Sequence, residues 1–391
     1  MRLAIVASHP IQYYAPIFRE LARRLDLKVF FAHRATQDDQ AKAGFGIKFN
    51  WDIDLLSGYD HVFMHNVAKQ PGLDRFSGCD TPEIGRWLAE DRFDAVLVQG
   101  WYRKSFLQTI FAAKRLGLPV LARGDSHIMT PRSNLKRSAK AVIYPAFLRL
   151  FDAALYVGKR SKDYWTHYNY PTARLFFSPH CVDTEWFSSR ATANSRDRLR
   201  NRLRIPPNAM VVLFAGKLLP FKRPLDIVAA AAVMKSLSHQ VSILVAGAGP
   251  AEPEMKIAAQ KAKISTHFLG FCNQSEMPEV YAASDVLVLP SEHETWGIVA
   301  NEALASGRPV VLADTVGAAP DLALDNIAGR VFPLGDIPAL AKALQEITTH
   351  PPSLQMIAAK SAAYSVAAAV DGIEAAVLKT QCAKSRKALY G

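Results

Sequence analysis

The chain has 391 residues, half of them apolar, and a formal net charge of +12 at pH 7. That length exceeds what one hydrophobic core usually supports, so two domains are expected. No apolar stretch reaches the roughly 18 residues of a membrane-spanning helix, and no secretory signal follows Met1. The four cysteines lack the spacing of disulfide frameworks or metal sites. We therefore expect a cytoplasmic globular protein with reduced thiols and no bound metal.

Short apolar segments alternate with helical patterns along the chain, which predicts parallel α/β architecture. The expected strands of the first half are residues 3–7, 27–32, 95–99, 120–123, 153–157 and 175–178. Those of the second half are residues 211–215, 241–246, 266–269, 286–289, 310–313 and 330–332. The pattern indicates two doubly wound, Rossmann-like parallel sheets that face each other across a cleft.

A polar, arginine-rich segment separates the two sets of strands and is typical of a linker. We expect a first domain over residues 1–187, the linker over 188–208 and a second domain over 209–371. The remaining residues, 372–391, have a helical pattern, and we expect this helix to pack back on the first domain.

Nearly all of the positive charge lies in residues 101–180, which hold 14 Lys and Arg against 3 Asp and Glu. Within this block, Arg132, Lys136, Arg137 and Lys140 precede the apolar residues 141–148. That order suits a helix on an anionic membrane surface, or one that grips an anionic acceptor. A solvated basic helix face is the alternative. Nucleic acid is not expected as a partner, because no known binding motif is present.

Residues 37–76 show no strand-helix rhythm. A long irregular segment within a compact domain is often functional. We interpret it as an insertion that contacts an acceptor, with an ordinary surface excursion as the alternative.

The second half contains two carboxylates around a strand-to-helix turn. Glu294 follows the apolar strand 286–289, and Glu302 lies in the helical pattern that begins after Gly297. Open α/β sheets bind ligands in loops beyond the carboxyl ends of their strands. A helix N-terminus at Gly297 would offer backbone N–H groups and a positive dipole end to a phosphate. Two acids for hydroxyls beside a phosphate site suggest a phosphorylated sugar as ligand.

Two lysines follow the first strand of the same half. Lys217 comes directly after Gly216, and Lys222 stands just before the next helical pattern. Each is a compact charge that can offset the negative charge of a leaving phosphate. The turn at Gly249 lets backbone approach a ligand, or is a plain turn. Phe268 belongs to a strand where a nucleotide base could rest, or it fills the core.

In that order, these segments resemble the retaining glycosyltransferases of family four, which have the GT-B fold. The resemblance implies that Glu294 contacts hydroxyls of the transferred sugar, that Glu302 holds the ribose, and that Lys217 and Lys222 bind the diphosphate. The family usually has arginine where this chain has Lys217. The resemblance also assigns donor contacts to Gly216, Gly249, Phe268, Trp296, Gly297 and Ile298.

Fewer residues of the first half match the family. His9 and Gln12 follow the first strand, where related enzymes often have a glycine-rich loop that this chain lacks. The resemblance implies a histidine near the transferred sugar, and the sequence offers either Asp125 or His127 for that place. For all four residues, an ordinary structural role is the alternative.

The resemblance implies transfer from a nucleotide-sugar donor with retention at the anomeric carbon, and it implies no bound cofactor. The acceptor would be a cell-surface glycan, a lipid-linked intermediate or a small molecule. One alternative is another GT-B activity, such as a sugar-nucleotide epimerase. The other is a non-catalytic protein that binds a membrane or carbohydrate on the same fold.

Overall fold

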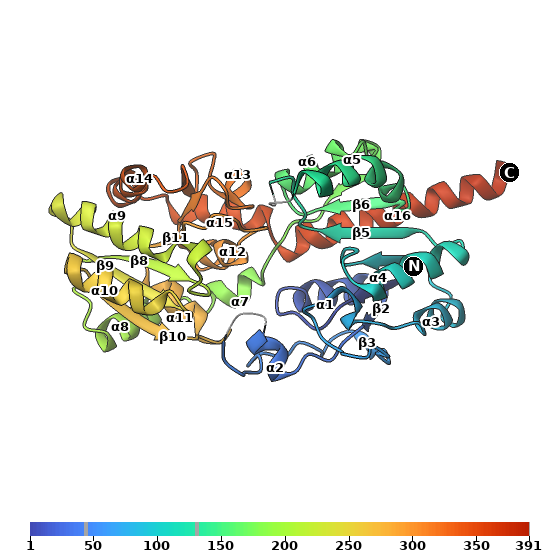
Figure 1. Ribbon diagram of the computed structural model, residues 1–391, viewed down its shortest axis with the longest axis horizontal. Helices are drawn as coiled ribbons and strands as arrows, with labels where there is room; N and C mark the ends of the chain where they lie inside the picture. The colour runs from blue at the N-terminus through green and yellow to red at the C-terminus, as the bar shows by residue number, and fades with distance from the viewer. Residues whose placement is uncertain (43–45, 130–132, 391) are drawn as a thin grey trace. The chain divides into compact units, whose positions relative to one another are not determined.

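The computed structural model describes residues 1–42, 46–129 and 133–390, with side chains up to residue 382 (Figure 1). The chain forms two compact units. Unit 1 comprises Met1–Ala43, Asp54–Pro179 and Val366–Gly391, and unit 2 comprises Gly44–Ile53 and His180–Ser365.

Unit 1 is built on a seven-stranded sheet of order β3-β2-β1-β4-β5-β6-β7, in which all pairs of neighbouring strands are parallel. Its elements are β1 (Arg2–Ala7), α1 (Ala15–Arg24), β2 (Asp26–Phe31), α2 (Gln37–Gln40), β3 (Asp60–Phe63), α3 (Ile84–Glu90), β4 (Ala95–Val98), α4 (Lys104–Arg115), β5 (Val120–Gly124), α5 (Asn134–Leu148), β6 (Ala153–Tyr156), α6 (Lys159–His167), β7 (Leu175–Phe177) and α16 (Val366–Tyr390).

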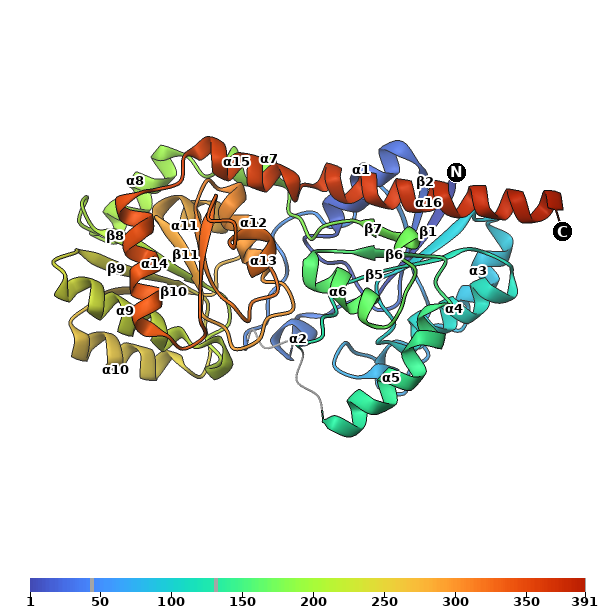
Figure 2. The same cartoon turned by 90° about the horizontal axis from the view of Figure 1, so that it is seen from above.

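The core of unit 1 follows from the alternation of strand side chains. Ala4, Val6 and Phe30 point to one face of the sheet, where they pack with buried side chains of α4 and α6 such as Phe106 and Trp165. Contacts of α16 with α1, β6 and β7 place these two helices together (Figure 2). The two faces are thus covered by different helices, as a doubly wound sheet requires.

Helix α16 approaches β7 at backbone distance. A Cβ on Gly372 would come within 1.8 Å of the Phe177 carbonyl oxygen, so the helix can lie this close only where it has no side chain. Next to this point, the Ser178 hydroxyl donates to the Ala369 carbonyl at 2.9 Å, and Arg123 Nε donates to the Ser178 oxygen at 3.0 Å. The helix begins at Val366, six residues before the expected position, and belongs to unit 1.

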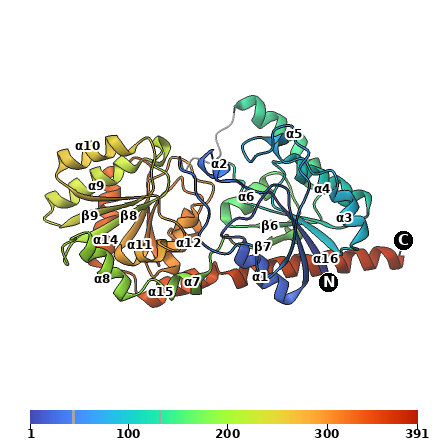
Figure 3. The same cartoon turned by 90° about the horizontal axis from the view of Figure 1, so that it is seen from below.

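Unit 2 is built on a six-stranded parallel sheet of order β10-β9-β8-β11-β12-β13. Its elements are α7 (Thr184–Ser188), α8 (Ala193–Arg202), β8 (Met210–Ala215), α9 (Pro224–Ser236), β9 (Val241–Ala246), α10 (Glu252–Ala262), β10 (Ser265–Gly270), α11 (Met277–Ala283), β11 (Val286–Leu289), α12 (Ile298–Ala305), β12 (Val310–Ala313), α13 (Ala319–Leu322), β13 (Gly329–Phe332), α14 (Ile337–Thr349) and α15 (Leu354–Ala363). Helix α9 contacts α10 and α14, and α11 contacts α8 and α12, in two layers (Figure 3).

The segment expected as a linker is an integral part of unit 2. The chain enters this unit at His180, seven residues before the expected boundary, because the His180 carbonyl accepts a hydrogen bond from Asn301 Nδ2 at 3.0 Å. A few residues on, Thr192 caps α8 through the backbone N–H of Ser195. The α8 helix then packs on α11 and buries Leu199. Its polar composition concealed this packing.

The irregular segment expected at 37–76 contains one strand that the sequence did not reveal. Residues Asp60–Phe63 form β3 at the edge of the first sheet, where each side chain stays partly exposed and the apolar signal is weak. Residues 46–53 belong to unit 2, where the ring of Phe49 packs on that of Phe271 with centroids 4.3 Å apart. In the same unit, Asn273 Nδ2 donates to the Asn50 carbonyl at 2.8 Å.

The predicted fold class is confirmed: all twelve expected strands have a counterpart within two residues at each end. Within the described residues, no helix is both long and apolar enough to span a membrane.

Candidate functional site

In unit 2, the turns that follow β8 and β9 pack on each other at the carboxyl edge of the sheet. A Cβ on Gly247 would come within 1.8 Å of the Gly216 carbonyl oxygen, and one on Gly249 within 2.5 Å of the Leu218 carbonyl oxygen. Both glycines have positive φ angles. They are therefore required by the packing of one turn on the other, and this packing fixes where Lys217 leaves the strand.

The two expected lysines lie close together after β8. Burial lowers the pKa of Lys217. Burial, and secondly the charge of Lys217, lower the pKa of Lys222 to about 8. The effect of the Lys217 charge on Lys222 indicates that the two ammonium groups lie in one positively charged region.

Glu294 contacts this region directly. Its carboxylate accepts a hydrogen bond from Lys222 Nζ and forms an ion pair with it, which opposes the lowering of the lysine pKa. The backbone of Glu294 is held by Gly317, whose N–H donates to the Glu294 carbonyl at 2.9 Å. A Cβ on Gly317 would come within 1.9 Å of the Thr295 carbonyl oxygen, so the two loops touch. Lysine and carboxylate are thus brought together by turns 72 residues apart in sequence.

A stacked pair of rings joins the same two turns. The ring of Phe221, next to Lys222, stacks on that of His293, next to Glu294, with centroids 4.5 Å apart and planes 15° apart. In addition, the N–H of Glu292 donates to the Phe221 carbonyl at 2.8 Å. The sequence analysis missed this contact. The only signal was that an aromatic residue neighbours each charged one.

The turn from β11 into α12 has the expected glycine. Gly297 is the N-cap residue with φ of 99°, a left-handed conformation that glycine adopts readily. The Trp296 side chain is buried, and its indole N–H donates to Asn301 Oδ1 at 2.7 Å. That bond fixes the first turn of α12 from within. The Trp296 ring therefore belongs to the core, and the contact of backbone at Trp296, Gly297 and Ile298 with a donor stays a prediction.

Glu302 lies apart from the lysines, inside α12. It is 5% exposed, and its carboxylate accepts hydrogen bonds from the Tyr281 hydroxyl at 2.7 Å and from Gln274 Nε2 at 3.5 Å. Burial raises the pKa of Glu302 to about 7, and the two hydrogen bonds only partly oppose that shift. Tyr281 and Gln274 are further residues of this region that the sequence did not single out.

Phe268 lies within β10, the edge strand, and the ammonium of Lys256 lies 5.0 Å from its ring centroid. The strand ends two residues later, at Gly270. At this end it is Phe271 that lies next to the segment carrying Phe49. Phe268 thus lies two residues before the end of β10, and its contact with a nucleotide base stays a prediction.

In unit 1, His9 and Gln12 lie in the turn after β1, and both are partly buried. The Ser8 hydroxyl and His9 Nδ1 are 2.9 Å apart. Burial lowers the pKa of His9 to about 4, with smaller contributions of the same sign from His33 and Arg103. His9 is consequently neutral at pH 7.

Asp125 and His127 follow β5 and differ in their surroundings. His127 is buried, whereas Asp125 is partly exposed. Burial raises the pKa of Tyr13, and the nearby Tyr14 and Asp125 act in the same direction. The charge of Asp125 is therefore felt at the tyrosines of the β1 turn. The sequence analysis did not name these tyrosines, although the pair follows Gln12 directly.

In the part of the chain that the structure describes, no group of three or more His, Cys, Asp and Glu side chains could hold a metal ion. The chemistry available at the carboxyl edge of unit 2 is that of two ammonium groups, a carboxylate and a glycine-started helix. This set can bind a diphosphate and accept hydrogen bonds from hydroxyls.

Residues 195–363 match the model of a family described as "Glycosyl transferases group 1". The D-inositol 3-phosphate glycosyltransferase of Streptomyces bingchenggensis is 35% identical over 182 residues, which cover 44% of this chain and 40% of that protein. The chain spans about half the length of the curated relatives it matches.

Solved structures resemble the whole chain. The glycosyltransferase from Rickettsia africae ESF-5 has a TM-score of 0.72 at 14% identity, covering 97% of this chain and 98% of that one. HepE from Anabaena, solved in complex with UDP, has a TM-score of 0.70 at 16% identity, covering 97% of this chain and 100% of that one. At such low identity the likeness concerns the fold, and it agrees with the predicted GT-B class.

Proposed function

We propose a function from the premise that the chain belongs to the glycosyl transferases group 1 family, whose model it matches over residues 195–363. The protein transfers a sugar from a nucleotide-sugar donor to a glycan, a lipid-linked intermediate or a small molecule, with retention at the anomeric carbon. Solved proteins of similar fold hold UDP or UDP-glucose, which supports a nucleotide sugar as the donor.

The observation that carries this proposal is the ion pair between Lys222 and Glu294, with Lys217 beside it. Without a ligand, the carboxylate balances one of two ammonium charges. A donor diphosphate would supply negative charge to both lysines and release Glu294 to accept hydrogen bonds from the sugar hydroxyls. Glu302 would contact the ribose, and the backbone N–H groups at Gly297 would face the phosphates.

The chemistry asked of this site is mainly positioning and charge stabilisation. As the bond between the anomeric carbon and the phosphate oxygen breaks, negative charge grows on the leaving diphosphate. Lys217 and Lys222 stabilise that charge more in the transition state than in the ground state, which is the condition for faster chemistry. The acceptor hydroxyl attacks from the face that the phosphate leaves, and its proton passes to the departing phosphate oxygen.

The donor can be identified by thermal shift, because a ligand of the native state raises its apparent stability. We expect one member of a panel of UDP-, GDP- and ADP-sugars to raise the melting temperature of the wild-type protein. The same sugar should shift Lys222→Ala much less and Lys261→Ala, an exposed lysine of α10, as much as wild type. No shift with any sugar, or equal shifts in all three proteins, would refute donor binding at these lysines.

Retention is tested on the product. With the identified donor, NMR of the first product should show the same anomeric configuration as the donor sugar, and an inverted product would contradict the proposal. Incubation of the donor without acceptor addresses the epimerase alternative. An epimerised sugar nucleotide in that sample would favour an epimerase over a transferase.

For the acceptor, we propose a group on or near an anionic membrane at the cytoplasmic face. The support is helix α5, where Leu135, Val142 and Ile143 are 81%, 80% and 60% exposed beside Lys136 and Arg137. Apolar residues seven and eight positions apart share a helix face, and basic neighbours attract anionic headgroups. Arg132 of the expected basic segment lies outside the described residues.

Co-sedimentation with vesicles that contain anionic lipid tests this surface. We expect binding at low salt, weaker binding at high salt, and several-fold weaker binding of Val142→Asp. The control is Leu354→Asp, an equally drastic change at a residue that is 67% exposed on α15. If the two variants bind alike, α5 is not the membrane surface. Acceptor assays can then include D-inositol 3-phosphate, the substrate in the name of the Streptomyces relative.

A further inference from the structure

A cavity of about 460 Å³ opens at the amino edge of the second sheet, away from the donor residues. That size falls in the range of small-molecule sites. Its wall is formed by the starts of β8 and β12, by one face of α8 and by the residues after α14. The polar and charged residues in this wall are Arg196, Arg200, Asn208, His239, Gln240, Asp285, Arg308 and Thr348.

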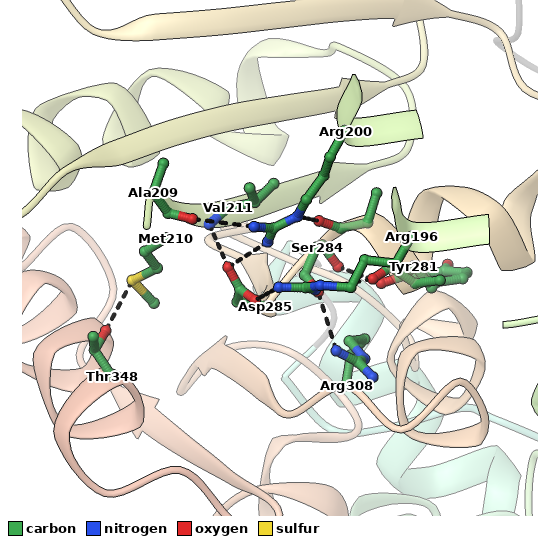
Figure 4. A network of polar contacts seen from close by, with 12 residues as sticks. Arg196, Arg200, Ala209, Met210, Val211, Tyr281, Ser284, Asp285, Arg308 and Thr348 are labelled. Atoms are coloured by element: carbon green, nitrogen blue, oxygen red, sulfur yellow. Dashed lines mark hydrogen bonds and ion pairs between the residues drawn. The ribbon is translucent and has the colours of Figure 1, made fainter. Parts of the chain in front are cut away.

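The carboxylate at the centre of this wall is fully engaged by its neighbours. Asp285 accepts from Arg196 Nη2, from Arg200 Nη2 and from the backbone N–H of Val211, each at 2.7 Å (Figure 4). The two arginines are four residues apart on α8, so they reach the carboxylate from one helix face. Asp285 therefore ties α8 to the start of β8.

Arg200 is explained by this structural task. Its Nε donates to the Ala283 carbonyl at 2.8 Å, and its Nη1 contacts the Ala209 carbonyl at 3.4 Å. Together with the ion pair to Asp285, these bonds give each nitrogen of the Arg200 guanidinium a partner. The buried charge is therefore compensated, and Arg200 serves to hold α8 against the start of β8.

Arg308 is not explained in the same way. Its guanidinium makes two long contacts with backbone carbonyls, one to Ser306 at 3.3 Å. The other is to Ser284 at 3.4 Å (Figure 4). Among the described residues it has no acidic partner, and its Nη2 donates to no protein group. Burial lowers the pKa of Arg308, the charges of Arg196 and Arg200 act in the same direction, and the charge of Asp285 opposes them. This arginine is thus held next to like charge in a partly buried place.

The charges around the cavity do not balance. Three guanidiniums face one carboxylate, which leaves two positive charges in the wall. Partly buried charge is costly unless an opposite charge accompanies it. A phosphate monoester carries up to two negative charges at neutral pH, and guanidiniums bind phosphate with paired hydrogen bonds.

We propose that this cavity binds the phosphate group of a small phosphorylated molecule, with Arg308 and Arg196 as its main ligands. Arg196 keeps its bond to Asp285 and offers Nε, which makes no contact with protein among the described residues. The cavity is larger than a phosphate alone requires. Asn208, His239 and Gln240 line the remaining space and can hydrogen-bond the organic part.

This site is distinct from the donor site. Donor residues follow the carboxyl ends of β8 and β11, whereas the cavity lies where β8 and β12 begin. Strands of a parallel sheet put these ends on opposite edges. The proposal therefore stands or falls independently of the proposed transferase activity.

Isothermal titration with inorganic phosphate and with pyrophosphate tests the site. We compare the wild-type protein with Arg308→Gln, which removes the charge at similar length. Arg330→Gln is the matched control, because Arg330 lies in the same unit but pairs with Glu346 outside the cavity. Lys222→Ala reports binding at the donor site. We expect Arg308→Gln to bind at least about tenfold more weakly, because the phosphate loses its charge-assisted hydrogen bonds to the guanidinium. Arg330→Gln should bind both anions within a factor of about two of wild type. Lys222→Ala should keep the phosphate binding that Arg308→Gln weakens, and should lose only the pyrophosphate bound at the donor site.

Three results would overturn the proposal: no phosphate or pyrophosphate binding by the wild type, unchanged binding by Arg308→Gln, or loss of phosphate binding in Lys222→Ala alone. Chemical footprinting tests whether the phosphate binds in this cavity. Phosphate should protect Arg308 from phenylglyoxal, measured by peptide mass, while Arg330 reacts at an unchanged rate. Protection of Arg330 in place of Arg308 would equally refute it. Circular dichroism of Arg308→Gln establishes that the variant is folded.

Discussion

The two edges of the six-stranded sheet carry the same kind of ion pair in different settings. At the carboxyl edge, Lys222 meets Glu294 through side chains that extend from two turns. At the amino edge, Asp285 joins Arg196 and Arg200 of one helix and also accepts a backbone N–H of β8. A carboxylate bonded to both a helix and a strand holds the fold together. A carboxylate that meets a lysine between two turns can exchange that partner for a ligand.

Glu302 provides a third setting for a carboxylate in the same unit. It is buried, and burial disfavours its negative charge. Only the neutral side chains of Tyr281 and Gln274 donate hydrogen bonds to it among the described residues. The three carboxylates therefore differ in what compensates their charge: a lysine between turns, two arginines of a clamp, or neutral donors. Each difference predicts a different response to substitution.

Loss of the lysine at the carboxyl edge should have the largest effect. We expect Lys222→Ala to lower kcat/KM for sugar transfer by about 10²–10³, the usual loss when one preorganised charge at a developing anion is removed. The melting temperature should change little, because the ion pair joins two turns and no core side chain is lost. Steady-state kinetics with the identified donor measure the first quantity, and calorimetry the second.

Lys261→Ala controls for the loss of one positive charge, since Lys261 is exposed on α10. Its kcat/KM should equal that of wild type. If Lys222→Ala keeps full activity, Lys222 does not take part in sugar transfer, and the proposed transferase site is wrong. Glu294→Ala should reduce kcat/KM as well, because the sugar then loses its acceptor of hydrogen bonds.

The pH dependence of the free energy of unfolding should report on Glu302, the carboxylate that is hydrogen-bonded by the neutral groups of Tyr281 and Gln274. In the folded state the pKa of Glu302 is about 7, above the 4.5 of an ordinary glutamate. Between these values the folded protein holds a proton that the unfolded chain has released, so this group destabilises the fold increasingly as pH rises. Glu302→Gln removes the effect, so its free energy of unfolding relative to wild type should rise by up to about 3 kcal/mol from pH 4.5 to 8.

Urea unfolding at several pH values gives this difference directly. Glu279→Gln is the control, because Glu279 pairs with Arg198 near the surface of the same unit. A Glu302→Gln curve parallel to that of wild type over this pH range would show that the carboxylate stays ionised, and that its hydrogen bonds compensate the burial.

Most of the fold could be predicted from the sequence, because buried parallel strands are continuous apolar runs. The exception, β3, is an edge strand whose residues Asp60–Phe63 are only partly buried. The packing of α8 was concealed for a related reason: the helix buries Leu199 and Arg200, but most of its residues have the polar composition of a linker. The pattern of apolar residues along the sequence therefore reveals strands that are buried on both faces. It does not reveal edge strands, or helices whose buried residues are polar and are paired with other parts of the chain.

The candidate site could be predicted in its residue types but not in its contacts. Lys222 and Glu294 were both identified, yet their pairing depends on two turns that pack through Phe221 and His293. The arginine cavity could not be predicted, because five separate chain segments line it. Such a site forms only when distant segments pack together in the fold, so no single segment of the sequence contains a motif for it.

The clamp at the amino edge should lose less energy than a fully buried pair. We expect Asp285→Asn to lower the free energy of unfolding by about 2 kcal/mol, below the 3–5 kcal/mol of deeply buried pairs, because the Asp285 side chain is 29% exposed. Asparagine can still accept from Val211, so the loss reports the two arginines. Denaturant unfolding measures it. A loss as small as that of a surface pair, such as Glu252→Gln on α10, would mean that Asp285 is no clamp.

The smallest effect concerns the shape of one cation at the carboxyl edge. The retaining glycosyltransferases that the sequence resembles usually have arginine where this chain has Lys217. If that position supplies charge to a diphosphate, Lys217→Arg should keep kcat/KM within about tenfold of wild type, and Lys217→Ala should lose more. Arginine adds a planar fork but is larger, and the Gly216–Gly247 contact leaves the turn little room to adjust. Equal kinetics for Lys217→Arg and Lys217→Ala would mean that shape, rather than charge, is what this position supplies. At the carboxyl ends of the strands, only the pair of Lys222 and Glu294 would then be a charged contact that a ligand can replace. The bonds of Asp285 at the amino ends would still differ from it by joining a helix to a strand.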